Sequence, residues 1–338
     1  MASSQGKIGY FEWARALGAL AIVALHVQVA CALSQSLSDA HATSLFVEAE
    51  ILVPLTRWAV PVFFMISGAL LLDPERQMGW RKVGRHVWRL ALVLLTFGLA
   101  FCLMEQAFDD HALGLAQLGA AVVALLSGDT WDHLWFLYAL IDLYLLTPLV
   151  RPFVAGASRR ELGWVIVGLW AMHCVVHTVN VLSGEYFVYL SSLPYALVYY
   201  LAGYWLHRYG RLSRGVVAAG LVSVVACMVL YALPDDAGAG VVLPEHAFML
   251  PYAAMVFLAL KRWLDRPVET HPVVALLADY SFGIYVIHPL FGHVIILLGH
   301  PMEWPFPLVQ VAIFVTGVLG STAITWLVRR IPLFRGKI

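Results

Sequence analysis

The sequence predicts an all-α integral membrane protein that crosses the bilayer about ten times and keeps both termini in the cytoplasm. Three observations lead to this fold class. The 338 residues are 61% hydrophobic and only 12% charged, with a mean hydropathy of +0.81, which is far too apolar for a water-soluble protein. Apolar stretches of about 17 to 25 residues recur along the whole length. Lysine and arginine are largely confined to alternate connections between these stretches.

The apolar stretches define the expected helices, with boundaries accurate to about three residues. The N-terminal segment has no leader-type cleavage site, so we expect the first helix to remain as an anchor. No polar block is long enough to fold separately, so residues 1–338 are expected to form a single transmembrane domain. The expected spans are near 13–33, 51–72, 87–105, 133–150, 162–182, 191–207, 215–233, 246–260, 273–298 and 307–328.

Basic residues orient these helices. Of the 21 lysines and arginines, 18 fall in the two tails and in one alternate set of connections, which the positive-inside rule places in the cytoplasm. The apolar segment 113–126 is short for a span, and an extra crossing there would move the later basic connections outside. We therefore expect it to be re-entrant or to lie along the outer interface. The outer connections, which contain no lysine or arginine, are 34–50, 106–132, 183–190, 234–245 and 299–306.

Two ionisable residues, Arg15 and His26, lie in the first span. They are eleven residues apart, so on an α-helix they share one face to within about 20° and are separated by about 16.5 Å of rise. Ionisable groups within a membrane usually face a polar cavity or a partner. A ligand with an anionic head near the cytoplasm and a reactive end inside the membrane would fit this pair.

Other candidate residues lie near the depth of His26. Arg57 and Asp142 either contact a substrate or neutralise each other, and His288 either contacts a substrate or hydrogen-bonds to a neighbouring helix. Trp135 and Tyr138 belong to an aromatic cluster at an outer interface, where aromatic residues commonly anchor helices; they could instead line a sugar site.

The basic stretch RKVGRHVWR, residues 81–89, places Arg81, Arg85 and Arg89 at helical spacing. This stripe either contacts anionic lipids or clamps phosphate groups, for which guanidinium groups are well suited. His173 and His177 have the i, i+4 spacing of metal ligands, but no third ligand is apparent and no metal is expected. The four cysteines lie in or beside apolar stretches and are expected to be small hydrophobic residues.

Four segments together resemble the membrane-bound acyltransferase-3 family, and particularly its stand-alone O-acetyltransferases of bacterial surface polysaccharides. The resemblance rests on the pair Arg15 and His26 and on three motifs in family order. These motifs are VPVFFMISGALLL at 60–72, HLWFLYALIDLYLLTPLV at 133–150 and YSFGIYVIHPL at 280–290.

The resemblance implies a multi-pass protein of the bacterial inner membrane that transfers acetyl from cytoplasmic acetyl-CoA to a glycan or lipid-linked sugar at the outer face. It implies that Arg15 and the arginine stripe hold the CoA phosphates, while His26 acts as a general base or carries the acetyl group covalently. No nucleic-acid partner is expected. A transporter or flippase of a lipid-linked sugar is the main alternative, and a membrane sensor or uptake module is another.

Overall fold

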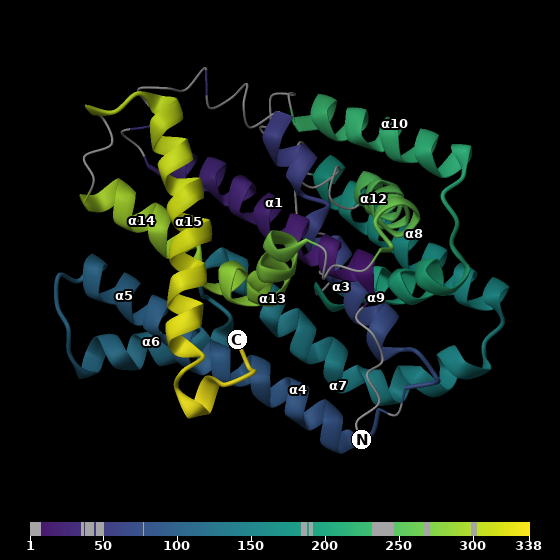
Figure 1. The fold of residues 1–338 in the computed structure, drawn as a ribbon, viewed down its shortest axis with the longest axis horizontal. Coiled ribbons are helices and arrows are strands. Elements are labelled where there is room, and N and C mark those ends of the chain that lie inside the picture. Colours follow the sequence, from purple (N-terminus) through teal and green to yellow (C-terminus); the bar gives the residue numbers. More distant parts are fainter. Residues whose placement is uncertain are drawn as a thin grey trace.

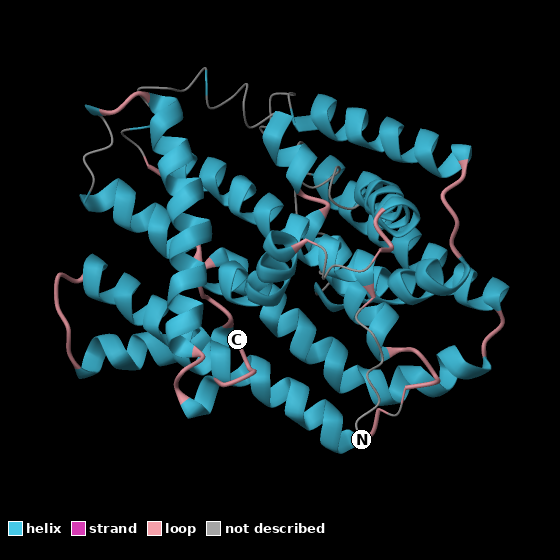
Figure 2. Ribbon diagram, in the orientation of Figure 1, coloured by secondary structure: helices cyan, strands magenta, loops and turns pink. Residues whose placement is uncertain are grey.

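The computed structural model is a bundle of helices (Figure 1). It describes residues 8–34, 51–76, 78–183, 192–231, 247–266, 271–298 and 303–338, together with residues 37, 44 and 188. No β-strand occurs in this part of the chain, as the ribbon coloured by secondary structure shows (Figure 2). The all-α prediction is therefore confirmed for the described residues. Three of the expected outer connections, 34–50, 183–190 and 234–245, lie wholly or largely outside them, and so does half of 299–306.

The helices follow one another along the chain with short connections. A π-helical turn, Leu94–Gly98, joins α4 to α5 without a break, so that Trp80–Phe108 forms one long helix. The α-helices are α1 (Gly9–Leu33), α3 (Ala59–Leu71), α4 (Trp80–Val93), α5 (Leu99–Asp109), α6 (Leu115–Ser127), α7 (Trp135–Gly156), α8 (Arg159–Ser183), α9 (Ser192–Tyr209), α10 (Arg214–Tyr231), α12 (Met249–Trp263), α13 (Pro272–Ile287), α14 (Pro289–Leu298) and α15 (Phe306–Val328).

Seven helices of the described chain are long and apolar enough to cross a membrane. The pair α13 and α14, bent by 51° at His288, would make an eighth span. Helices α9 and α12 overlap two further expected spans but fall outside this group. Helix α12 has only 15 residues, and α9 contains several tyrosines that are buried by neighbouring helices. The described helices thus include seven or eight candidate spans, and the expected total of about ten is not confirmed.

Helix α6 covers most of the segment 113–126 and has only 13 residues, which is too short for an ordinary span. It turns back after α5 and packs against it. The Tyr138 hydroxyl on α7 donates a hydrogen bond to the Leu125 carbonyl, at 2.7 Å, and so fixes the end of α6. This arrangement agrees with a segment that does not cross the membrane, while its side of the membrane stays a prediction.

Helices α3 and α9 pack closely against each other, and two glycines allow the approach. A Cβ atom built on Gly68 would lie 1.7 Å from the Tyr200 carbonyl oxygen, and one on Gly203 would lie 2.0 Å from the Met65 carbonyl oxygen. Small residues that let backbones approach are typical of membrane helix packing. Helix α1 packs against α3 and α13 beside this pair (Figure 1). The central helices therefore hold α1, with Arg15 and His26, inside the bundle.

Candidate functional site

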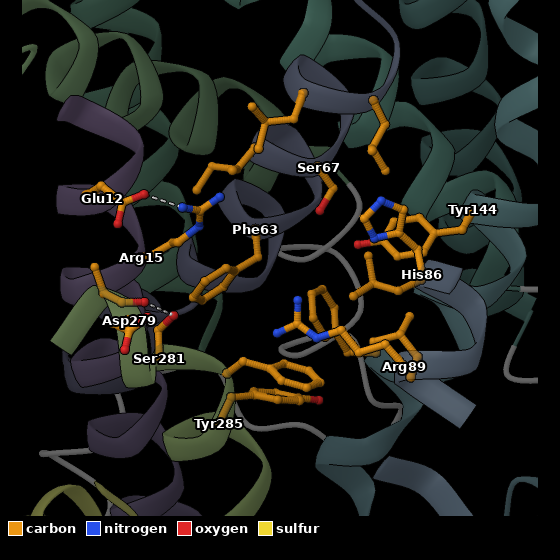
Figure 3. Close-up of a pocket in the computed structure, with 18 residues that line it drawn as sticks. Glu12, Arg15, Phe63, Ser67, His86, Arg89, Tyr144, Asp279, Ser281 and Tyr285 are labelled. Carbon is orange, nitrogen blue, oxygen red and sulfur yellow. Dashed lines mark hydrogen bonds and ion pairs between the residues drawn. The ribbon is translucent and has the colours of Figure 1, made fainter. Parts of the chain in front are cut away.

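Helix α1 contributes to two separate cavities. Arg15 lines a cavity of about 400 Å³, which we call the Arg15 cavity (Figure 3). His26 lines a second cavity of about 310 Å³, which we call the His26 cavity. Arg15 and His26 are eleven residues apart, so these two residues lie about 16.5 Å apart along the helix axis. The segments α4–α5 and α13–α14 also contribute to both cavities, which therefore follow one another along the same helices.

The Arg15 cavity combines two guanidinium groups with hydroxyl and imidazole groups. Arg15 from α1 and Arg89 from α4 approach the same space from opposite sides (Figure 3). These groups are hydrogen-bond donors or, for hydroxyls and imidazole, can act as donors, which suits recognition of an anion. The other polar residues that line it are Glu12, Ser67, His86, Tyr144, Asp279, Ser281 and Tyr285.

Carboxylates partly balance these cations. Arg15 Nη1 donates to Glu12 Oε1 one helical turn away, and the Arg15 side chain keeps an exposed fraction of 30%. Asp279 is paired with Arg329 at 2.5 Å. Arg89 donates through Nε to the Lys337 carbonyl at 2.5 Å, and its guanidinium carbon lies 4.9 Å from the centre of the Phe282 ring. Arg89 is therefore held by a carbonyl and a ring, and its guanidinium keeps its positive charge toward the cavity.

Three histidines from distant segments meet at the His26 cavity. The ring centres of His26 and His288 are 4.9 Å apart, those of His133 and His288 are 5.8 Å apart, and those of His26 and His133 are 6.1 Å apart. His133 and His288 are buried, while His26 is partly exposed. The cluster thus joins α1, the 3₁₀ turn Asp132–Leu134 before α7 and the bend between α13 and α14.

Hydrogen bonds to the main chain define the tautomers of these rings. His26 Nδ1 lies 2.9 Å from the Ile22 carbonyl, and His288 Nδ1 lies 2.8 Å from the Ile284 carbonyl. A carbonyl oxygen only accepts, so each Nδ1 carries the hydrogen and, in the neutral ring, Nε2 has the lone pair. His133 has the opposite tautomer, because its Nε2 lies 3.0 Å from the carbonyl of Val286. His26 therefore presents a basic nitrogen on the side away from its own carbonyl partner.

The mouth of the His26 cavity is acidic. Glu105 on α5, Asp129 after α6 and Asp132 before α7 line it, and all three are exposed. Trp131 stacks on Phe101 and on His293, with ring centres 4.4 Å apart in both pairs. No lysine or arginine is among the described residues that line this cavity. The charged side chains at this mouth are thus opposite in sign to Arg15 and Arg89, which line the Arg15 cavity.

A buried layer of side chains separates the cavities. Tyr285 lines the Arg15 cavity and donates a hydrogen bond to the carbonyl of His133, which lines the His26 cavity. Phe136 packs against Tyr285 with ring centres 5.2 Å apart. One turn of α13 separates Tyr285 from His288. A group that passes from one cavity to the other would have to cross this layer.

The structure brings only some of the predicted site residues into the cavities. Arg15, Arg89, His26 and His288 line them, whereas Arg81 and Arg85 are exposed and lie outside both. The reason is geometric: residues four apart on an α-helix drift by about 40°, so the stripe turns away from the cavity.

The remaining predicted residues lie elsewhere. Trp135 packs on Phe64 and Tyr195, and Tyr138 is used to hold α6, so neither lines the described cavities. Asp142 is an exposed residue of α7 and does not line either cavity. Arg57 lies over the Tyr231 ring at 5.5 Å, next to α10.

Several cavity residues were not singled out from the sequence. His133 and Tyr285 lie inside two of the motifs that carry the family resemblance, and Glu12 lies one turn before Arg15. These positions offered a signal, since each is adjacent in the chain or on the helix to a selected residue. His86 and Tyr144 also lie inside stretches quoted from the sequence, 81–89 and 133–150, but their meeting does not follow from either stretch, because it depends on the packing of α4 on α7, which puts the ring centres 5.7 Å apart.

The spacing of His173 and His177 brings their rings together without forming a recognisable metal centre. The rings stack with centres 5.6 Å apart. Among the described residues, no group of three or more His, Cys, Asp or Glu side chains is arranged to hold a metal ion. The four cysteines are free thiols, and three of them are buried.

Comparison with known proteins adds one match. A family model described as "Acyltransferase domain" matches residues 8–326, which is nearly the whole chain. No curated protein and no solved structure matches. The matched range includes all residues that line the two cavities.

Proposed function

Because the chain belongs to the acyltransferase-3 family, we propose that it transfers an acetyl group from acetyl-CoA to a hydroxyl group of a glycan on the opposite side of the bacterial inner membrane. The observation that carries this proposal is the placement of the two cavities along α1. A cavity lined by Arg15 and Arg89 and a cavity lined by three histidines follow one another on the same helices. A reaction between a soluble anionic donor and a polyhydroxyl acceptor needs these two sites in sequence.

The Arg15 cavity supplies the donor site. CoA carries several phosphate groups, and guanidinium groups bind phosphate through paired hydrogen bonds. Arg15 and Arg89 are the cavity residues suited to this contact, with Tyr144, His86 and Ser67 as additional donors. The pantetheine arm then extends along α1 toward His26 and crosses the layer at Tyr285 and Phe136. The exposed residues Arg81 and Arg85, which lie outside the cavity, attract the anionic donor from the cytoplasm to the cavity mouth.

His26 supplies the base. Its Nε2 lone pair takes the proton of the acceptor hydroxyl, and the oxygen attacks the thioester carbonyl carbon. A C–O bond forms, the C–S bond breaks, and the proton passes from His26 to the departing thiolate sulfur. Transfer through an acetyl-histidine is the alternative sequence, in which Nε2 itself attacks the thioester before the hydroxyl does. Both sequences require the tautomer that the Ile22 carbonyl imposes.

The acceptor reaches His26 from the other cavity. We place this cavity at the outer face, because the basic tails and connections orient the Arg15 end of α1 toward the cytoplasm. A glycan or lipid-linked sugar enters past Glu105, Asp129 and Asp132 and brings one hydroxyl to the histidines. A transporter of a lipid-linked sugar would need no donor site with two arginines.

Transfer of labelled acetyl tests the proposal. Proteoliposomes that hold the full chain receive acetyl-CoA labelled in the acetyl group on one side and a glycan on the other. The wild-type chain should move the label into the glycan, and His26→Gln should reduce the rate about a hundredfold to ten-thousandfold, because glutamine does not take up a proton near neutral pH.

His177→Gln is the matched control, since His177 lies on α8 outside both described cavities. It should keep the wild-type rate. A glycan that crosses the membrane without gaining label would instead support the transporter, and full activity of a well-folded His26→Gln variant would remove His26 from the mechanism.

A further inference from the structure

The polar groups of the His26 cavity are sorted by depth. The three carboxylates of Glu105, Asp129 and Asp132 are exposed at its mouth, and the buried rings of His133 and His288 form its floor. These side chains come from α5, from residues 129–133 and from the bend between α13 and α14. A ligand in this cavity therefore meets negative charge first and imidazole nitrogens last.

The floor contains a buried acceptor that lacks a protein donor. His288 has an exposed fraction of 3%, and its Nε2 has no hydrogen-bond partner among the described residues. Since Nδ1 donates to the Ile284 carbonyl, Nε2 carries a lone pair and points away from its own helix backbone. Buried polar atoms without partners are rare in native proteins. A ligand that brings a hydroxyl hydrogen to this nitrogen would satisfy it.

His26 presents a second lone pair beside the first. The two rings are only 4.9 Å apart between centres, and both have Nδ1 bound to a carbonyl of their own chain segment. Two neighbouring acceptors suit a ligand with two neighbouring hydroxyl groups. One hydroxyl faces His26 and reacts, while the adjacent one donates to His288.

The mouth selects by charge. Carboxylates repel an anionic ligand and attract a cationic one, and three of them line the same cavity, so that their effects on one ligand add. The described lining contains no lysine or arginine that would offset this repulsion. The same field keeps the polyanionic donor away from the acceptor cavity, while the arginines of the other cavity attract it.

We infer that the acceptor is a polyol with adjacent hydroxyls and no carboxylate, phosphate or sulfate on the part that enters the His26 cavity: a neutral sugar or an amino sugar. This inference rests on the proposed function for the fate of the hydroxyl, and on the cavity alone for the charge preference. It assigns the three carboxylates and His288 to acceptor selection, a role distinct from the chemistry at His26.

Three glycosides that share one ring shape test the charge preference. Methyl glucoside is neutral, methyl glucosaminide is cationic and methyl glucuronide is anionic near neutral pH. Their affinities for the full-length protein in detergent micelles are measured by saturation-transfer NMR titration, without acetyl-CoA. The glucuronide should bind at least about tenfold more weakly than the glucoside, and the glucosaminide at least as tightly as the glucoside.

Variants separate the mouth from the floor. The double variant Glu105→Gln, Asp132→Asn should bring the glucuronide and the glucoside to within about threefold of each other. Asp142→Asn, which removes an exposed carboxylate outside both described cavities, should leave the preference unchanged. His288→Asn should weaken the glucoside and the glucuronide by a similar factor, because it removes a hydroxyl contact and no charge.

Binding and turnover give independent answers. Equal affinities for the three glycosides, no binding of any of them, or a preference that survives the double variant would overturn the inference. Acetyl transfer is then assayed on the same preparations. If the charge preference is present but no acetyl is transferred, the proposed function is contradicted and the inference stands. If acetyl is transferred to the glucuronide as fast as to the glucoside, the proposed function stands and the inference is contradicted.

Discussion

Arg89 and Arg81 illustrate how much the surroundings of one residue type can differ along a single helix. Both lie on α4, two turns apart. Arg89 lines the Arg15 cavity and is held by the Lys337 carbonyl and the Phe282 ring, whereas Arg81 is exposed. A guanidinium already held in position loses less conformational entropy when it binds phosphate. At the scale of residues, the donor site is therefore defined by position on the helix and not by arginine content.

Replacing these two arginines separately tests that distinction. Arg89→Ala should raise the Kd for CoA by about tenfold to hundredfold, which corresponds to the loss of one hydrogen bond to a charged group. Arg81→Ala should change it by less than about threefold, because an exposed charge in water contributes little. Isothermal titration of the purified protein measures both values. An equal increase of the Kd for CoA in the two variants would mean that the phosphate groups contact the solvent-exposed face of α4.

At the scale of elements, the contact of α3 with α9 depends on two glycines that face opposing backbones. At Gly68 and Gly203 a backbone carbonyl group of the facing helix occupies the space that a side chain would need. Helix α3 also contributes Phe63 and Ser67 to the Arg15 cavity. Separation of the two helices would therefore change the cavity as well as the stability of the bundle.

Gly203→Ala tests this packing. The added methyl group would lie 2.0 Å from the Met65 carbonyl oxygen, so the helices must separate, and we expect a destabilisation of about 1 to 3 kcal/mol. Gly168→Ala on α8 is the matched control, because a Cβ there meets no atom within 4 Å. Thermal unfolding in detergent should show a lower midpoint for Gly203→Ala alone. An unchanged midpoint would mean that α3 and α9 pack less tightly than the structure indicates.

At the scale of the whole molecule, the orientation in the membrane follows from the distribution of charge. The 18 lysines and arginines outside the expected spans all fall on one predicted side. The two cavities lie along the same helices, so this orientation also decides which of them faces the acetyl-CoA of the cytoplasm.

Reporter fusions test the orientation. Fusions after residues 80, 155, 210 and 265 should report the cytoplasm, and those after 40, 110, 187 and 238 should report the outer side. The enzymatic activity of paired reporters that function on only one side of the membrane provides the measurement. A consistent reversal from residue 155 onward would show that α6 crosses the membrane, despite its 13 residues.

Properties that depend on local periodicity could be predicted from the sequence. Apolar stretches of bilayer length predicted helices near the observed positions, since hydropathy and helix rise act within each segment. Some boundaries differ by more than the expected three residues; for example, one helix begins at Trp80 instead of near 87, and α7 ends at Gly156 instead of near 150. The shared face of Arg15 and His26 follows from 3.6 residues per turn, and both residues do line cavities on α1. The same periodicity was insufficient for α4, where only one arginine of the predicted stripe reaches a cavity.

The tertiary structure alone decided which distant residues meet. His26, His133 and His288 come together because α1, the turn before α7 and the bend between α13 and α14 meet in the fold, and such contacts depend on the shapes of whole helices. The π-turn at Leu94–Gly98 had a similar effect within one helix. His86 and Glu105 would lie about 100° apart on a regular α-helix, and the extra residue of a π-turn brings them to one face. Local sequence thus determines where each helix forms, whereas interhelical packing and the π-turn in the helix Trp80–Phe108 determine which residues line the cavities.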